Sequence, residues 1–98
     1  MYDIFYMDTA SNDFAKIAEY LDGVGSGLAD KIIGEIINRV DSLETMPFRY
    51  PKHFQRPQYR VTTVKSYSVF YKVKEDTHVV EIHRIIYGSR DIENAIKN

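Results

Sequence analysis

The sequence has no cysteine and no tryptophan, and only three prolines and five glycines among its 98 residues. Without cysteine the chain can form neither a disulfide framework nor a metal site with thiolate ligands. No apolar run approaches the roughly 18 residues that a membrane-spanning helix needs. The first ten residues contain Asp3 and Asp8 and lack the basic-then-apolar order of a signal peptide. These absences predict a small soluble protein of the cytoplasm.

The apolar residues that are present suffice for one core. Hydrophobic residues make up 44% of the chain and aromatic residues 13%, eight of them tyrosine. This composition argues against disorder. A chain of this length is too short for two domains and buries about 60–70% of its unfolded surface on folding. We therefore expect a single domain over residues 1–98.

Charge is unevenly distributed along the chain. Residues 1–48 contain three Lys or Arg against nine Asp or Glu, whereas residues 49–98 contain ten against five. Seven of the basic residues lie between Arg49 and Lys74, a segment without any acidic residue. A basic half of this kind favours an anionic partner, either nucleic acid or an acidic protein, although a solvated basic surface gives the same pattern.

The first half of the chain has the pattern of a strand followed by two helices. Residues 1–7 are aromatic and β-rich, which predicts a strand. Apolar residues then recur at helical spacing from Asp8 or Thr9 to Leu21, and again over residues 28–44. Three glycines within residues 23–27 indicate a hinge between the helices, and Pro47 stops the second one. The pattern predicts a helical hairpin.

The second half has the period of strands. After a loop with Pro51 and Pro57, apolar residues alternate over residues 59–64 and 67–74, and residues 78–87 form a further β run. Residues 91–97 have the pattern of a short terminal helix. The order β-α-α-β-β-β predicts an α+β fold in which the helical hairpin packs on one face of an antiparallel sheet.

Alternation along these strands predicts a cationic face on the side of the sheet that the helices leave open. If Val61, Val69 and Tyr71 face the helices, then Arg60 and Lys72 stand on the open face, a plausible phosphate-binding surface. The residues expected to bind an RNA phosphate or an acidic partner are Arg60, Lys72, Arg84, Arg90, Lys52 and Arg56.

The histidines do not predict a metal site. His78 and His83 lie five residues apart in one strand and point to opposite faces, and His53 lies in a loop. The serines lack a nucleophile-elbow motif around them. We expect neither a metal nor a cofactor.

Motifs in the strands give the chain a resemblance to a known family. They are Tyr-Arg-Val at residues 59–61, Tyr-Ser-Val-Phe-Tyr-Lys-Val at 67–73 and Ile-His-Arg-Ile-Ile-Tyr-Gly-Ser-Arg-Asp at 82–91. The first helix adds Ala10, Asp13, Ile17 and Tyr20, and the second ends with Leu43 and Pro47. Over nearly its whole length the chain resembles the RelE/ParE superfamily of bacterial toxins.

The resemblance implies a growth-inhibiting toxin of a type II toxin–antitoxin module, also described as a plasmid stabilisation protein. A cognate antitoxin would neutralise it by wrapping an extended acidic segment over the toxin, which suits the basic second half. RelE-like members cut messenger RNA on the ribosome without a metal ion. ParE-like members inhibit DNA gyrase.

The residues carried over from RelE-like members make an incomplete catalytic set. Arg60 and Arg90 match basic positions of that site, but Thr62 and Ser68 stand where it has a lysine and an arginine, and Ile96 stands near the position of its tyrosine. Loss of a general base or a phosphate clamp lowers a rate by about 10²–10⁴ each. The sequence therefore favours gyrase inhibition.

Two alternatives stay open. As an mRNA endonuclease, the protein would use Arg60 and Arg90 on the phosphate, with His83 or Lys65 for proton transfer, or else Tyr87 or His53. As a non-toxic RNA-binding or interaction module, it would use the same basic residues to bind its partner without catalysing a reaction.

Overall fold

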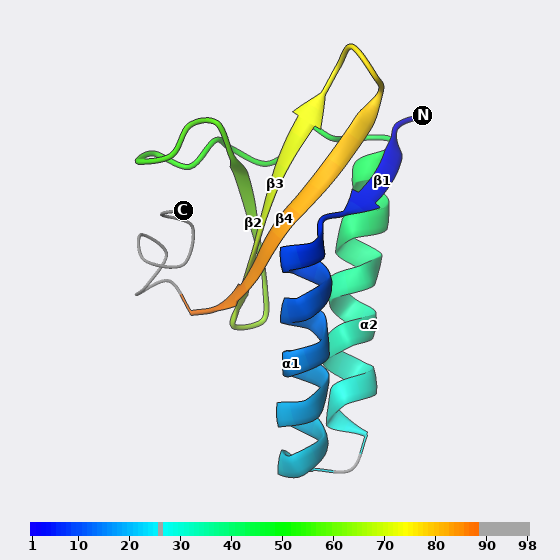
Figure 1. The fold of residues 1–98 in the computed structure, drawn as a ribbon, viewed down its shortest axis with the longest axis vertical. Helices are drawn as coiled ribbons and strands as arrows, with labels where there is room; N and C mark the ends of the chain where they lie inside the picture. The colour runs from blue at the N-terminus through cyan, green and yellow to red at the C-terminus, as the bar shows by residue number, and fades with distance from the viewer. Residues whose placement is uncertain (26, 89–98) are drawn as a thin grey trace.

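Two neighbouring helices pack on one face of a four-stranded sheet in the computed structural model (Figure 1). The structure describes residues 1–25 and 27–88. The elements, in chain order, are β1 (Asp3–Tyr6), α1 (Asp8–Val24), α2 (Leu28–Asp41), the 3₁₀ turn η1 (Ser42–Glu44), β2 (Arg60–Val64), β3 (Tyr67–Lys74) and β4 (Val79–Tyr87). The predicted α+β fold is confirmed, and the helix predicted over 91–97 lies outside the described residues.

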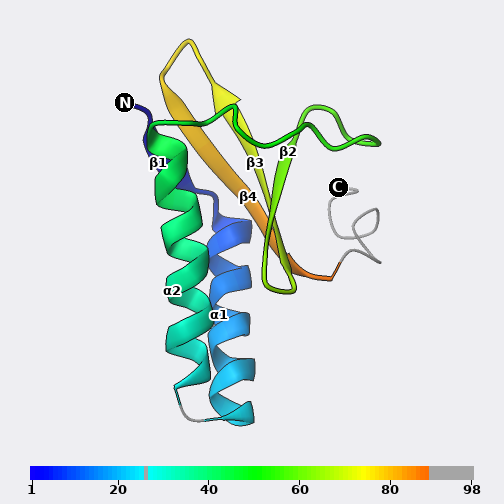
Figure 2. The ribbon, with the colours of Figure 1, turned by 180° about the vertical axis from the view of Figure 1, so that it is seen from behind.

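The sheet has the strand order β1-β4-β3-β2. Strands β2, β3 and β4 form the predicted antiparallel meander. Strand β1, however, runs parallel to β4, from Asp3 opposite Val79 to Tyr6 opposite Ile82, so the sheet is mixed. Neither strand carries a local signal for this pairing, because it depends on where the helical hairpin and the long loop return the chain. Figure 2 shows that loop crossing from the end of α2 to the far edge of the sheet.

The helices end slightly differently from their predicted ends. Helix α1 continues through Gly23 to Val24, and the backbone N–H of Gly25 donates to the carbonyl of Leu21. Gly27 precedes α2 with φ at +79°, a conformation that favours glycine. The end of the second helical run tightens into η1, as is common in a last turn. Neither helix has the length and apolar character to cross a membrane among the residues described.

The core lies between the helices and the sheet. Ile36, Val40 and Leu43 are fully buried on the α2 side, and Val69 and Tyr71 are fully buried on β3. Each such aliphatic side chain contributes roughly 1.5–3 kcal/mol by leaving water. The hydroxyl of Tyr71 donates to the carbonyl of Pro47 at 2.9 Å. Burial raises the pKa of Tyr71 to about 12.

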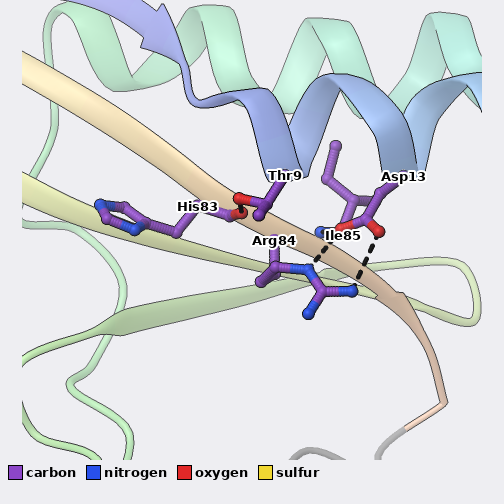
Figure 3. Close-up of polar contacts among 5 residues, drawn as sticks. All are labelled: Thr9, Asp13, His83, Arg84 and Ile85. Atoms are coloured by element: carbon purple, nitrogen blue, oxygen red, sulfur yellow. Dashed lines mark hydrogen bonds and ion pairs between the residues drawn. The ribbon is translucent and has the colours of Figure 1, made fainter. Parts of the chain in front are cut away.

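The first turns of α1 take the place of a strand along the outer edge of β4. Beyond Tyr6 this edge has no β1 partner. The hydroxyl of Thr9 donates to the carbonyl of His83 at 2.6 Å, and the carboxylate of Asp13 accepts from the N–H of Ile85 at 2.9 Å. The same carboxylate accepts two hydrogen bonds from the guanidinium of Arg84, at 2.8 and 3.0 Å (Figure 3). The hydrogen bonds to Asp13 raise the pKa of Arg84.

Asp13 has a sequence signal that composition alone obscures. It lies three residues after Ala10 and four before Ile17, on the face of α1 that packs inward. A carboxylate on that face is expected to find a buried cation or backbone donors. The sequence contains this spacing but does not show which arginine meets it.

We expect Asp13→Asn to lower the free energy of unfolding by roughly 2–4 kcal/mol, because the charge-assisted hydrogen bonds between Asp13 and Arg84 would be lost from a largely buried pair. Urea denaturation followed by circular dichroism measures the change. Glu19→Gln, an exposed carboxylate of the same helix, is the matched control and should change stability by less than about 0.5 kcal/mol. Equal effects from the two variants would contradict this account of Asp13.

We expect Tyr71→Phe to cost roughly 1–3 kcal/mol at neutral pH, because the buried carbonyl of Pro47 would lose its donor. The pH dependence gives a second readout. A tyrosine has a pKa near 10 in the unfolded chain, whereas Tyr71 has a pKa of about 12 in the folded protein. The stability that Tyr71 contributes is therefore complete below pH 10 and is lost as the pH rises from about 10 to 12. Denaturation midpoints from pH 9 to 12 should fall less steeply in Tyr71→Phe than in the exposed control Tyr20→Phe; identical slopes would argue against this.

Candidate functional site

A basic groove of about 680 Å³ lies between the loop before β2 and the end of β3. Four of its lining side chains are cationic, namely Lys52, Arg60, Lys72 and Lys74, and the turn after β3 adds Glu75 and Asp76 at one end. The remaining lining residues are Phe48, Pro57, Gln58 and Val73. The structure thus brings together Lys52, Arg60 and Lys72, three of the six residues predicted to bind an anionic partner.

The local pairing of the loop with β2 places two of these cations side by side. Lys52 and Arg60 are direct antiparallel partners, flanked by hydrogen bonds from His53 N to Tyr59 O and from Val61 N to Pro51 O. Side chains of directly opposed residues share a face, and like charges there destabilise each other. An anion between Lys52 and Arg60 would relieve that repulsion.

Arg60 is held by neutral groups. Its Nη1 donates to the carbonyl of Tyr50 at 2.7 Å, and its guanidinium carbon lies 5.1 Å from the centroid of the Phe48 ring. Among the described residues, none of its recorded contacts is with a carboxylate. The charge of Arg60 is therefore positioned but not neutralised.

The predicted face of Arg60 was wrong. Arg60 lies opposite Tyr71 and Thr62 lies opposite Val69, so both share the helix side of the sheet, whereas Val61 lies opposite Phe70 on the other side. A one-residue error in register moves every side chain of a strand to the other face. Valine and threonine alternate too weakly in β2 to fix the register.

The side of the sheet away from the helices is covered in part by the loop before β2. Phe70 points to that side and is fully buried. The His53 ring lies 5.7 Å from the Phe70 ring, and the Tyr59 ring lies 6.3 Å from it. The expected open face is therefore closed around Phe70 by aromatic side chains.

The loop that covers Phe70 depends on the buried His53. Its Nδ1 accepts hydrogen bonds from the backbone N–H groups of Gln55 and Arg56, at 3.2 and 3.1 Å. Nδ1 of His53 therefore holds the loop in place, which gives His53 a structural part in the fold.

Polar and aromatic side chains gather around the ring of Tyr59, and we call Tyr59, Lys72, Glu81 and His83 the Tyr59 cluster. Lys72 Nζ lies 4.9 Å from the ring centroid, and the His83 ring packs edge-on at 5.3 Å. His83 Nε2 lies 3.0 Å from Glu81 Oε1, with both side chains largely buried. This arrangement couples a histidine to a carboxylate beside one lysine.

Sequence reasoning missed Tyr59 and Glu81. Glu81 stands two residues before His83 and therefore on the same face of β4, which is a readable signal. The place of Tyr59 over β3 and β4 depends on how the loop folds back, which no local pattern specifies.

The other predicted residues lie apart from the groove. The guanidinium of Arg84 is engaged by Asp13, and Lys65 Nζ lies 3.7 Å from Glu35 Oε1 at the opposite end of β2. Arg56 is half-buried within the loop, and Arg90 lies outside the described residues. Their functional roles stay predictions. Within residues 1–25 and 27–88, no three acidic or histidine side chains group to hold a metal ion.

Structural comparison finds solved chains with a similar fold. The chain is similar to a protein from the chromosomal ParDE toxin–antitoxin system of P. aeruginosa, with a TM-score of 0.76 and 22% identity over 91% of this chain and 98% of the other. It is also similar to a chain of the RelBE2 toxin–antitoxin complex of Mycobacterium tuberculosis, with a TM-score of 0.67 and 18% identity over 88% and 96%. A chain of the intact E. coli RelBE complex gives 0.64 and 16% over 92% and 100%.

Two sequence comparisons gave different outcomes. The search of curated protein sequences found no match to the chain. The family model described as "ParE toxin of type II toxin-antitoxin system, parDE" matches residues 4–92, which is most of the chain. The strand order, the helical hairpin and this match lead to one conclusion: the chain belongs to the ParE toxin family and is a toxin of a type II toxin–antitoxin module.

Proposed function

We propose that the protein arrests growth in the ParE manner, by binding DNA gyrase, and that a cognate antitoxin neutralises it. The family match over residues 4–92 supports this direction. The observation that carries it is the covered sheet face, where a RelE-like nuclease would need accessible basic and proton-transferring groups.

The side chains at RelE-like positions are poorly disposed for cleavage. Thr62 is 3% exposed and Ser68 is 6% exposed, and neither can act as a base or a cationic clamp. Arg60 lies on the helix side of the sheet, and Arg84 is paired with Asp13. A toxin that acts by binding needs no such catalytic set, which favours gyrase inhibition.

The basic groove suits an acidic antitoxin segment. The similar solved chains from M. tuberculosis and E. coli come from toxin–antitoxin complexes. Lys52, Arg60, Lys72 and Lys74 all line this groove at the edge of the sheet. None of the ion pairs among the described residues involves any of the four. Complementary charge speeds association and selects the partner more than it adds affinity.

A second function, cleavage of messenger RNA, is favoured by the Tyr59 cluster. The carboxylate of Glu81 can orient His83 for proton transfer. Lys72 packs on the same Tyr59 ring as His83, so its ammonium group is near enough to stabilise a negative charge that develops on the substrate there. His83 would then act as the base that the Thr62 and Ser68 positions lack.

Gyrase inhibition is tested with purified protein in a supercoiling assay, alongside transcript integrity after induced expression. We expect inhibited supercoiling and intact transcripts. Arg60→Gln should weaken the inhibition roughly tenfold, because it removes an uncompensated cation from the basic groove. Lys31→Gln, an exposed lysine at the far end of α2, is the control and should inhibit like the wild type. Normal supercoiling with cleaved transcripts would overturn the proposal.

The variant His83→Ala separates the two functions. Under gyrase inhibition, growth arrest and supercoiling inhibition should persist, provided that the variant retains the wild-type circular dichroism spectrum. Under RNA cleavage, His83→Ala should abolish both the arrest and the cut transcripts, with a loss of about 10²-fold or more in the cleavage rate.

A further inference from the structure

A second polar pocket, of about 360 Å³, lies on the helix side of the sheet near its β2 edge. Its walls are the last turns of α2, the loop at Arg49 and Tyr50, and the end of β2. Its lining residues are Glu35, Asn38, Arg39, Ser42, Arg49, Tyr50 and Val64. We call it the Tyr50 pocket. None of its lining residues belongs to the basic groove or to the Tyr59 cluster.

Two arginines share the ring of Tyr50. The guanidinium carbon of Arg39 lies 5.3 Å from the ring centroid, and that of Arg49 lies 5.5 Å from it. Arg39 comes from the last turn of α2, whereas Arg49 comes from the loop ten residues later. The tertiary fold therefore places two positive charges around one aromatic side chain.

Neutral groups alone hold these two cations. Nη1 of Arg39 donates to Thr62 Oγ1 at 2.6 Å and to the carbonyl of Thr63 at 3.1 Å. Arg49 is exposed, and its recorded side-chain contact is with the Tyr50 ring. No ion pair joins either guanidinium to a carboxylate among the described residues. Arg39 ties α2 to β2, but the position of Arg49 has no such structural explanation.

The one acidic residue of the pocket does not cancel this charge. Glu35 Oε1 lies 3.7 Å from Lys65 Nζ, so Glu35 already has a cationic neighbour of its own. Glu35 Oε2 is buried without a hydrogen-bond partner, so this carboxylate stays part of the pocket. The two lining arginines still outnumber the one lining carboxylate, which leaves the pocket with one net positive charge. Two guanidinium groups with free donors match a phosphate group, which accepts several charge-assisted hydrogen bonds at once.

We propose that the Tyr50 pocket binds a phosphate group of a nucleic-acid strand. The strand source is favoured because Tyr50 also joins this pocket to the basic groove: its carbonyl accepts from Arg60, which lines the groove. Phe48, two residues before Tyr50, lines the basic groove and is 46% exposed, which leaves part of its ring free to stack on a base. This inference depends on the proposed function in one respect: gyrase, the proposed target, would bring its DNA strand to the pocket.

The test is direct binding of the full-length protein to a fluorescein-labelled 12-nucleotide dT strand, measured by fluorescence anisotropy between 50 and 200 mM salt. Arg49→Gln should weaken binding roughly tenfold. It should also make the slope of log K against log salt shallower by about 0.7, the value for one phosphate contact on a single strand. Lys31→Gln is the matched control and should keep the wild-type affinity and slope. Arg49 is exposed, so its replacement should leave the thermal midpoint unchanged.

Competition distinguishes the sources of negative charge. Inorganic phosphate and ATP should displace the strand only at far higher concentrations, and polyglutamate of similar charge should compete weakly. Equal affinity for ATP and for the strand would overturn a strand site in favour of a free nucleotide. Arg49-dependent binding of polyglutamate without binding of dT would overturn it in favour of an acidic protein, and an unchanged salt slope in Arg49→Gln would overturn it outright. The binding assay contains no gyrase, so a negative result there would overturn the phosphate site without bearing on gyrase inhibition, which the supercoiling assay tests separately.

Discussion

The carboxylate of Asp13 joins helix α1 to strand β4 beyond Tyr6, where β4 has no pairing with β1. Strand β1 ends at Tyr6, and β4 continues well beyond it. A bare strand edge exposes unpaired backbone groups and invites aggregation. Helix α1 closes part of that edge with side chains, through Thr9 on His83 and Asp13 on Ile85 and Arg84 (Figure 3).

This contact also determines which cations are available to a partner. Arg84 has the sequence context of a binding residue, but its charge is used within the fold. Arg39 is partly used in the same way, because it bonds to β2 through neutral oxygens. Arg49, Lys52 and Arg60 have no carboxylate partner among the described residues. Arg49 lies over the ring of Tyr50, Arg60 donates to its carbonyl, and Lys52 is the bridge partner of Arg60. The basic surface is therefore centred on the loop and not on the open face of the sheet.

The loop before β2 changes the character of the sheet. It buries Phe70 beneath His53 and Tyr59, and Tyr59 in turn brings Lys72 and His83 to its ring. Such a covered face favours recognition over chemistry, because a cleavage site must admit a backbone phosphate between its acid and its base. The Glu81–His83 pair is the part of this surface that retains acid–base capacity.

Local patterns in the sequence determined the α+β class, the helical hairpin and the meander, because periods of 3.6 and 2 and the glycine and proline positions report which face each segment buries. The concentration of basic residues between Arg49 and Lys74 was also visible there. The tertiary structure alone decided the parallel pairing of β1, the face of Arg60, the pairing of Asp13 with Arg84 and the two arginines around Tyr50. Each of these joins residues that are distant along the chain or depends on a one-residue register, and neither leaves a trace in local periodicity.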